Sequence, residues 1–285
     1  MANGQLSKQL KITIGDIGIS VTANKRFKID SDYSLFLSQS RPEVILRAHY
    51  GFIPQIELDE KIFDSQHWAL HRSNEKFILC VHHPQSHSSS IIKLGVFQLN
   101  FESGDIYLGM EASQTDSPFI YPLDQILMIN LLSQGKGLLI HSCGIDNSGE
   151  GLLFAGSSGA GKSTIARLGI NKKGVKVLSD DRIIVKQKDG EFWIYGTPWH
   201  GDAKICSPEK APLKKILFLK HAENNIIKKI GPVDAASRLM VCSFPTYWDK
   251  KGMEFVLNFC TEIVQKVPCY EMGFVPEESV LNLVL

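Results

Sequence analysis

One nine-residue segment restricts what this chain can fold into more than any other feature. It reads Gly-Ser-Ser-Gly-Ala-Gly-Lys-Ser-Thr and satisfies the pattern G-x-x-x-x-G-K-[ST]. Its glycines let the backbone curl, so that successive N–H groups can point at one anion such as a polyphosphate. Lys162 can reach the β- and γ-phosphates as a point charge, and Ser163 can offer a hydroxyl to Mg²⁺, which prefers oxygen ligands. The segment therefore predicts a phosphate-binding loop, whose residues are Gly156, Ser157, Ser158, Gly159, Ala160, Gly161, Lys162, Ser163 and Thr164.

The residues on either side of the loop have the order that such a site requires. Residues 151–155 form a short apolar run that is typical of a buried strand. Residues 164–168 read as the start of a helix, whose positive end would also face the anion. The alternative is a glycine-rich turn without a ligand, and the strand–loop–helix order favours the phosphate site over it.

Composition and charge bound the kinds of protein that this chain can be. Its 285 residues suffice for one large domain or two ordinary ones, and 44% hydrophobic with 21% charged residues are typical of a globular chain. The net charge of +1 indicates neither a nucleic-acid nor a membrane partner, and no apolar run has the length of a membrane span. The first six residues lack the order of a signal peptide, and the six cysteines form no C-x-x-C pair. We therefore expect a cytoplasmic protein with free thiols and without a nucleic-acid or membrane partner.

The first 120 residues predict a β-rich domain, because alternating apolar and polar residues recur in pairs around turn sequences. No catalytic pattern occurs there, so the role of this domain is not predicted. His82, His83 and His87 could capture a metal ion, but their serine-rich surroundings favour a surface loop. The predicted strand pairs are 10–14 with 17–21, 68–72 with 77–81, and 91–100 with 105–110.

A second domain is predicted after a polar stretch at 113–118, because strand and helix patterns alternate from there onward. We therefore expect an α/β (α+β) chain, with a β-rich domain at 1–120 and a catalytic domain at 121–285. His141 falls on an expected strand that pairs with the strand before the loop. Helices are expected at 125–132 and, with an interruption near Pro245, at 234–265, and strands at 138–145, 174–178, 183–186, 192–195, 213–219 and 270–275.

Two adjacent acidic residues, Asp180 and Asp181, follow the lysine of the loop at the end of an expected strand. Neighbouring side chains on a strand point in opposite directions. One carboxylate can therefore hold Mg²⁺ while the other accepts the proton of an attacking hydroxyl. Arg182 and Lys204 could neutralise charge on a transferred phosphoryl group. A solvated strand end is the alternative, and the loop upstream favours the catalytic interpretation.

Three further residues allow two interpretations each. His141 lies within an apolar strand, where a histidine is either structural or, beside the loop strand, part of the site. His200 could contact a substrate or pack in an aromatic corner. Trp199 could stack on a nucleotide base or fill the core. The residues alone leave these alternatives open.

The order of these motifs resembles the HPr serine kinase/phosphorylase family, and the resemblance covers roughly residues 122–220. The motifs are His141, the loop at 156–163 and residues 179–182. Residues 121–124 and 196–213 are similar to HPr-kinase-related proteins of unassigned substrate. Some of those relatives phosphorylate serine on a ribosomally made peptide.

The resemblance implies a phosphoenolpyruvate-carboxykinase-like nucleotide fold, distinct from the usual P-loop NTPases. It implies ATP and Mg²⁺ as cofactors and transfer to a serine hydroxyl. Carried over by position, Asp180 would be the base and His141 would support it. Asp181 and Ser163 would hold the metal, and Lys162 would hold the phosphates. The relatives also suggest a homo-oligomer.

The chain departs from that family in two places. Ser179 stands where the family has alanine, and no counterpart follows of the arginine- and glycine-rich segment that the bifunctional enzymes use. The chain is therefore not expected to run phosphorolysis of phosphoserine, and HPr itself is not expected as its substrate.

The first hypothesis is a kinase that transfers the γ-phosphoryl group of ATP to a hydroxyl, with a peptide, protein or small molecule as acceptor. The second is a nucleotide-binding sensor or partner module without transfer activity, in which ATP only stabilises the fold. A kinase or carboxykinase acting on a small metabolite is the third.

Overall fold

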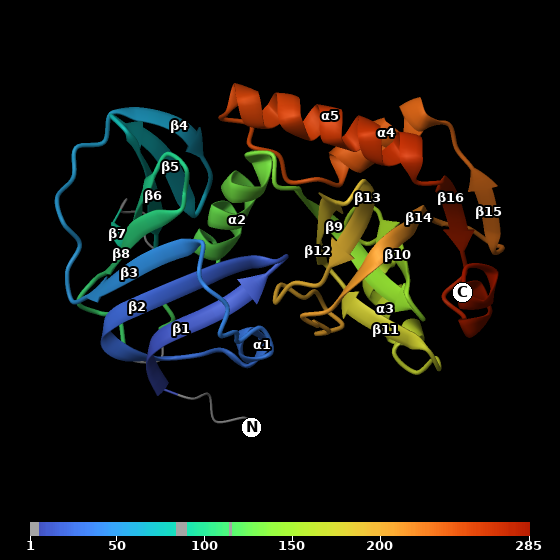
Figure 1. Ribbon diagram of the computed structural model, residues 1–285, viewed down its shortest axis with the longest axis horizontal. Helices are drawn as coiled ribbons and strands as arrows, with labels where there is room; N and C mark the ends of the chain where they lie inside the picture. Colours follow the sequence, from blue (N-terminus) through green and yellow to red (C-terminus); the bar gives the residue numbers. More distant parts are fainter. Residues whose placement is uncertain (1–5, 84–89, 114–115) are drawn as a thin grey trace. The chain divides into compact units, whose positions relative to one another are not determined.

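The computed structural model describes residues 6–83, 90–113 and 116–285, within which the chain is a mixed α/β structure with two large sheets (Figure 1). The mixed α/β class expected from the sequence is confirmed. His87 and part of the polar stretch at 113–118 lie outside the described residues.

The chain divides into two compact units, Met1–Leu131 and Leu132–Leu285, and each carries an eight-stranded sheet of described residues. The functional boundary predicted after residue 120 stays a prediction, because compactness alone does not show where an activity begins. No helix in the described part of the chain is both long and apolar enough to cross a membrane.

The sheet of the first unit has the strand order β1-β2-β3-β8-β7-β6-β5-β4 (Figure 1). β3 runs parallel to its neighbours β2 and β8, and the other pairings are antiparallel. The three predicted strand pairs are confirmed as β1–β2, β5–β6 and β7–β8. The elements are β1 (Leu6–Ile14), β2 (Ile17–Lys28), α1 (Ser31–Ser34), β3 (Val44–Tyr50), β4 (Glu60–Asp64), β5 (Trp68–Ser73), β6 (Lys76–His82), β7 (Ile91–Gln98), β8 (Ser103–Leu108) and α2 (Leu123–Ser133).

Burial in this unit follows the two-residue period of a strand. In β3, Val44 and Leu46 are buried, while Ile45 and Arg47 between and after them are exposed. α2 has apolar residues on almost every side, and a helix of that kind is stable only when it is covered. The helix predicted at 125–132 is therefore confirmed and is slightly longer than predicted.

A half-buried lysine, Lys93, lies near two acidic side chains in this unit. The Nζ of Lys93 donates a hydrogen bond to the Ser117 carbonyl at 3.1 Å. Burial lowers the pKa of Lys93 to about 8, although the nearby carboxylates of Asp124 and Asp116 oppose this change. The folded unit therefore holds this proton less tightly than the unfolded chain does.

We expect the stability of the first unit to rise as the pH increases from 8 towards 10. In that range the unfolded chain binds more protons at Lys93 than the folded one, so each pH unit adds about 1.4 kcal/mol to the free energy of unfolding. Urea unfolding, followed by hydrogen exchange in β7 and β8, would measure the rise at pH 7.5, 8.5 and 9.5. In Lys93→Met this rise in the free energy of unfolding with pH should vanish. If the free energies of unfolding of the variant and the wild type differ by a constant amount across this range, the prediction is contradicted.

The second unit contains a circuit of five strands. β10 pairs with β9 on one side and with β14 on the other, and β12 and β13 complete the circuit between β9 and β14. β16 and then β15 extend the sheet beyond β14, and β11 pairs with β9. The elements are β9 (Leu138–Asn147), β10 (Glu150–Ala155), α3 (Lys162–Gly169), β11 (Val175–Ser179), β12 (Arg182–Lys188), β13 (Glu191–Tyr195), β14 (Lys210–His221), β15 (Ile226–Lys229), α4 (Pro232–Val241), α5 (Lys250–Lys266), β16 (Cys269–Phe274) and the 3-10 helix η1 (Glu278–Leu283).

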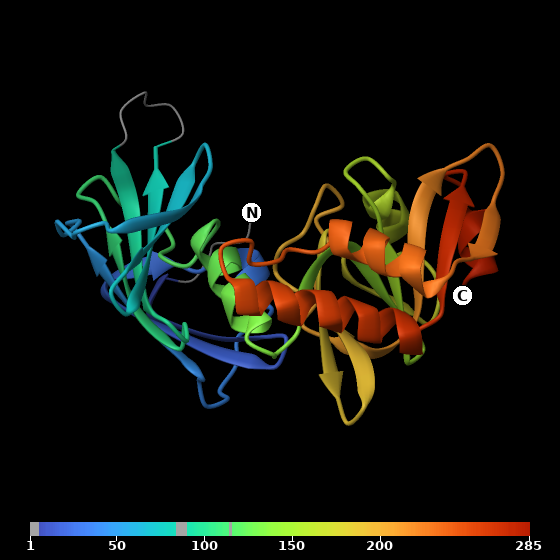
Figure 2. The ribbon, with the colours of Figure 1, turned by 90° about the horizontal axis from the view of Figure 1, so that it is seen from above.

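Residues 151–155 of strand β10 are all apolar because both faces of the strand are buried there. Leu152 and Phe154 belong to the cluster of buried residues that includes α3 and η1. Leu153 and Ala155 belong to the cluster that includes α4 and α5, which lie side by side along the unit in Figures 1 and 2. A strand covered on both faces appears in the sequence as a continuous apolar run, as predicted for 151–155.

Candidate functional site

The glycine-rich loop connects β10 to α3, as the sequence predicted. β10 ends at Ala155, and α3 begins at Lys162. Gly159 and Gly161 have φ values of +80° and +105°, which L side chains rarely adopt. The first turn of α3 follows directly, and its N–H groups have no partner within the helix. The loop can therefore present backbone donors to an anion.

Lys162 lies inside this loop. Its Nζ donates to the carbonyls of Gly156 and Ser157, both at 2.9 Å, and the residue is 6% exposed. Burial lowers the pKa of Lys162, although the nearby Asp181 carboxylate opposes this. A phosphate that bound here would take the place of the two carbonyls as the partner of the ammonium.

Two glycines of the loop are expected to respond differently to alanine. At Gly161 an added Cβ would lie 2.3 Å from the Phe274 Cζ, so Gly161→Ala combines overpacking with an unfavourable φ. At Gly159 nothing lies within 4 Å, so Gly159→Ala carries the unfavourable φ alone. We expect losses in the free energy of unfolding of about 2–5 kcal/mol for Gly161→Ala and about 1–2 kcal/mol for Gly159→Ala. Urea unfolding of both variants measures this, and equal losses would contradict the packing argument.

Asp180 is fully buried and its carboxylate is surrounded by donors. Oδ1 accepts from the backbone N–H of Gly201 at 2.9 Å and of Ile205 at 3.4 Å. Oδ2 accepts from the backbone N–H of Ala203 at 2.9 Å and from the Ser163 hydroxyl at 2.9 Å. The Asp180 carboxylate thus joins the segment that contains these amides to the first turn of α3.

Asp181 faces a different set of partners. The His141 Nε2–H donates to its Oδ1 at 2.9 Å, and the Arg182 guanidinium contacts its Oδ2. Burial alone would raise the pKa of Asp181, but the His141 hydrogen bond and the charges of Arg182, His141 and Lys162 outweigh it and lower the pKa. The side chains of Asp181 and His141 are 23% and 26% exposed. This carboxylate is therefore ionised at neutral pH and accessible.

The backbone explains why neighbouring carboxylates have separate partners. β11 and β12 both run antiparallel to β9, with Ser179 opposite Gly144 and Arg182 opposite His141. The two aspartates occupy the interruption between these strands. As expected, the two side chains serve different partners. The pairs differ from those implied by the resemblance, however, because Ser163 contacts Asp180 and His141 contacts Asp181.

The other predicted residues lie close to this pair. Trp199 is buried and its carbonyl accepts from the Ser179 hydroxyl, which agrees with its packing alternative. His200 is half-buried, with Nδ1 donating to the Gly201 carbonyl at 2.9 Å. Lys204 has a positive φ, and its backbone N–H donates to the Gly201 carbonyl.

Phe244 and His221 lie beside the site, and neither carried a usable signal in the sequence. The Arg182 guanidinium lies over the ring of Phe244 at 4.4 Å, and His221 Nε2 donates to the Gly159 carbonyl at 2.8 Å. The amides that surround Asp180 belong to the backbone, so no residue type reveals them. Only the unusual content of the loop after Gly196 could have drawn attention to them.

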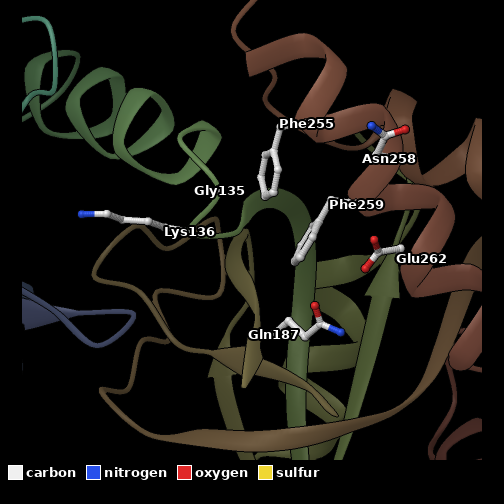
Figure 3. A pocket seen from close by; sticks show the side chains of 7 residues that line it. All are labelled: Gly135, Lys136, Gln187, Phe255, Asn258, Phe259 and Glu262. Atoms are coloured by element: carbon white, nitrogen blue, oxygen red, sulfur yellow. The ribbon is translucent and has the colours of Figure 1, made fainter. Parts of the chain in front are cut away.

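A separate hollow of about 210 Å³ lies on α5 (Figure 3). Phe255 and Phe259 project from the helix toward Gln187. None of the predicted site residues lines the hollow, which is bounded by Gly135, Lys136, Gln187, Phe255, Asn258, Phe259 and Glu262. Across the described ranges, no three His, Cys, Asp or Glu side chains are grouped so that they could hold a metal ion.

Comparison with known proteins gives one family and one solved structure of interest. A family described as "SynChlorMet cassette protein ScmC" matches residues 122–274, which is more than half of the chain. No curated protein matches. Among solved structures, the HPr(Ser) kinase/phosphatase from Coxiella burnetii is similar at 12% identity, over 51% of this chain and 90% of that chain, with a TM-score of 0.31. A TM-score of that size does not establish a shared fold.

Proposed function

The chain belongs to the family of the SynChlorMet cassette protein ScmC, and from that premise we propose that its second unit is a kinase dependent on ATP and Mg²⁺. It would transfer the γ-phosphoryl group to a hydroxyl, with a serine of a peptide or protein as the acceptor. The matched segment supports this, because it contains the loop, both aspartates, His141 and the amides around Asp180. The choice of serine rests on the resemblance of the motifs, and the geometry supports the reaction class.

The observation that carries the proposal is the contact of 2.9 Å between the Ser163 hydroxyl and Asp180 Oδ2, one residue after the loop lysine. Adjacent oxygen ligands of an octahedral Mg²⁺ with bonds of 2.0–2.1 Å lie about 2.9 Å apart. The two side chains therefore fit as ligands of one Mg²⁺ ion. Mg²⁺ is typically held by one or two carboxylates together with substrate phosphates, so no larger cluster is needed. When bound, it would neutralise charge on the β- and γ-phosphates.

Asp181 is the better base of the two aspartates. Asp180 is fully buried, and three of its four hydrogen bonds come from backbone amides that hold its carboxylate toward Ser163 and away from an acceptor hydroxyl. Asp181 is accessible, and the His141 Nε2–H orients its Oδ1. Its low pKa is compatible with this role, because phosphoryl transfer proceeds through a loose transition state in which the hydroxyl proton leaves late. The proposal thus exchanges the roles that the resemblance implied for the two aspartates.

The glycine-rich loop would bind the phosphates of ATP. The ammonium of Lys162 and the first N–H groups of α3 would bind the phosphates, with the positive end of the helix facing them. Arg182 is held against Asp181 beside the same loop and would offset negative charge on the transferred group.

Nucleotide binding tests the role of Lys162. Calorimetry of the full chain with Mg·ATP should show binding, and Lys162→Met should lower the affinity at least about tenfold, because the phosphates lose their point charge. Lys173→Met removes an exposed lysine beyond the same helix and should leave the affinity unchanged. Equal affinities for Lys162→Met and the wild type would overturn the loop assignment.

Incubation with γ-labelled ATP, Mg²⁺ and serine-containing peptides, proteins and small hydroxyl compounds tests the transfer itself. Label on a peptide or protein serine supports the proposal. ATP binding without transfer to any acceptor would favour the sensor module instead, and label on small compounds alone would favour a metabolite kinase.

A further inference from the structure

Ser179 carries a hydroxyl that joins two parts of the site. The residue is fully buried. Its Oγ donates to the Trp199 carbonyl at 3.1 Å and accepts from the backbone N–H groups of Asp181 at 3.3 Å and Arg182 at 3.4 Å. One side chain thus connects the turn that bears the catalytic aspartates to the segment that begins at Trp199.

That segment, residues 199–205, is the one whose amides surround Asp180. It approaches the aspartates closely at Gly201, where an added Cβ would lie 2.8 Å from Asp180 Oδ2 and 3.1 Å from Asp181 Cβ. Its far side is fixed as well, because the Ser207 N–H donates to the Leu178 carbonyl at 2.8 Å. With so little free space, a small displacement of the segment moves both carboxylates.

We propose that Ser179 is a positioning residue of the proposed kinase. Its hydroxyl holds the turn at 180–182 in a fixed position relative to the segment at 199–205. The inference rests on the proposed function, because the turn carries the base and the metal ligand. Without the hydroxyl, Asp180 still joins the turn to the segment, but the N–H groups of Asp181 and Arg182 lose their shared acceptor. Asp181 then moves relative to His141, and the acceptor hydroxyl no longer meets a fixed base.

Ser179→Ala should lower kcat about tenfold while KM for ATP stays within about twofold, because the loop that binds the phosphates is untouched. A residue that only supports the fold would lower the stability and leave kcat and KM of the folded enzyme unchanged. Hydrogen exchange in residues 199–205 should also become faster.

Ser142→Ala is the matched control. Ser142 is equally buried, and its hydroxyl donates to the Ile140 carbonyl within its own strand, at 3.3 Å. This variant should retain the wild-type rates and exchange. If Ser179→Ala does not fold, Gly201→Ala replaces it, because an added Cβ displaces the same segment while the Ser179 hydroxyl remains.

A folded Ser179→Ala with wild-type kcat overturns the inference, whether or not its exchange is faster. Faster exchange together with a lower kcat and an unchanged KM for ATP supports it. If the wild type transfers no phosphoryl group, the proposed function fails. In that case unchanged exchange in 199–205 would also refute the connection through Ser179, and faster exchange would support that connection alone.

Discussion

Asp181→Asn is expected to lower kcat for phosphoryl transfer by about 10²–10⁴-fold while the affinity for Mg·ATP stays within about threefold. The amide preserves the shape of the side chain but cannot take up the proton of the acceptor hydroxyl. The loop, Lys162 and the contact between Ser163 and Asp180 are unchanged, so nucleotide binding should persist. Rates with γ-labelled ATP and a labelled acceptor, together with calorimetry, measure the two quantities separately.

Asp189→Asn is the control for this substitution, because Asp189 is exposed on the turn between β12 and β13. It should behave as the wild type does. Wild-type transfer by Asp181→Asn would rule out Asp181 as the base. If Asp180→Asn then lost transfer and kept Mg·ATP affinity, the roles implied by the family resemblance would be restored.

Asp180→Ala is expected to affect both stability and metal dependence. The change leaves three backbone N–H groups in the interior without their carboxylate, and each such group costs about 1–3 kcal/mol. We therefore expect the free energy of unfolding to fall by about 3 kcal/mol or more. The Mg²⁺ concentration needed for half-maximal ATP turnover should rise at least about tenfold, because one of the two proposed protein ligands is lost.

Urea unfolding and Mg²⁺ titration of ATP turnover measure these two effects. Asp202→Ala is the matched control, because it removes an exposed carboxylate from the same segment and should change the stability by no more than about 0.5 kcal/mol. A stable Asp180→Ala with normal Mg²⁺ dependence would remove Asp180 from the metal site.

The sequence predicted those parts of the site whose chemistry depends on residue type at a fixed spacing. The loop at 156–164 and the strand and helix around it belong to this class, because glycines, lysine and serine have distinct physical uses in that order. The partners of Asp180 and Asp181 could not be predicted from residue type and spacing. They depend on where β11 ends and β12 begins along β9, and on amides from a segment some twenty residues later in the chain. Neither feature is encoded in the aspartates themselves.

The fold, like the site, could be predicted only where the paired residues are close together in the sequence. The hairpin β1–β2 was predicted because its pairing is local. β3 was not predicted, because it lies between two parallel partners and one of them, β8, is distant in the chain. Its alternation of Val44, Leu46 and Ala48 with exposed residues is a regular strand pattern without a turn signal beside it.

The surroundings of Asp180 consist of main-chain amides, and this has a consequence for how the family can diverge. The side chain at 202 can vary, since it contributes none of its own atoms to the carboxylate. The spacing between Gly201 and Ile205 is not free, because one inserted or deleted residue would shift every amide away from its oxygen. In distant members of the family, the segment that corresponds to residues 201–205 should therefore keep a constant length even where its amino acids differ.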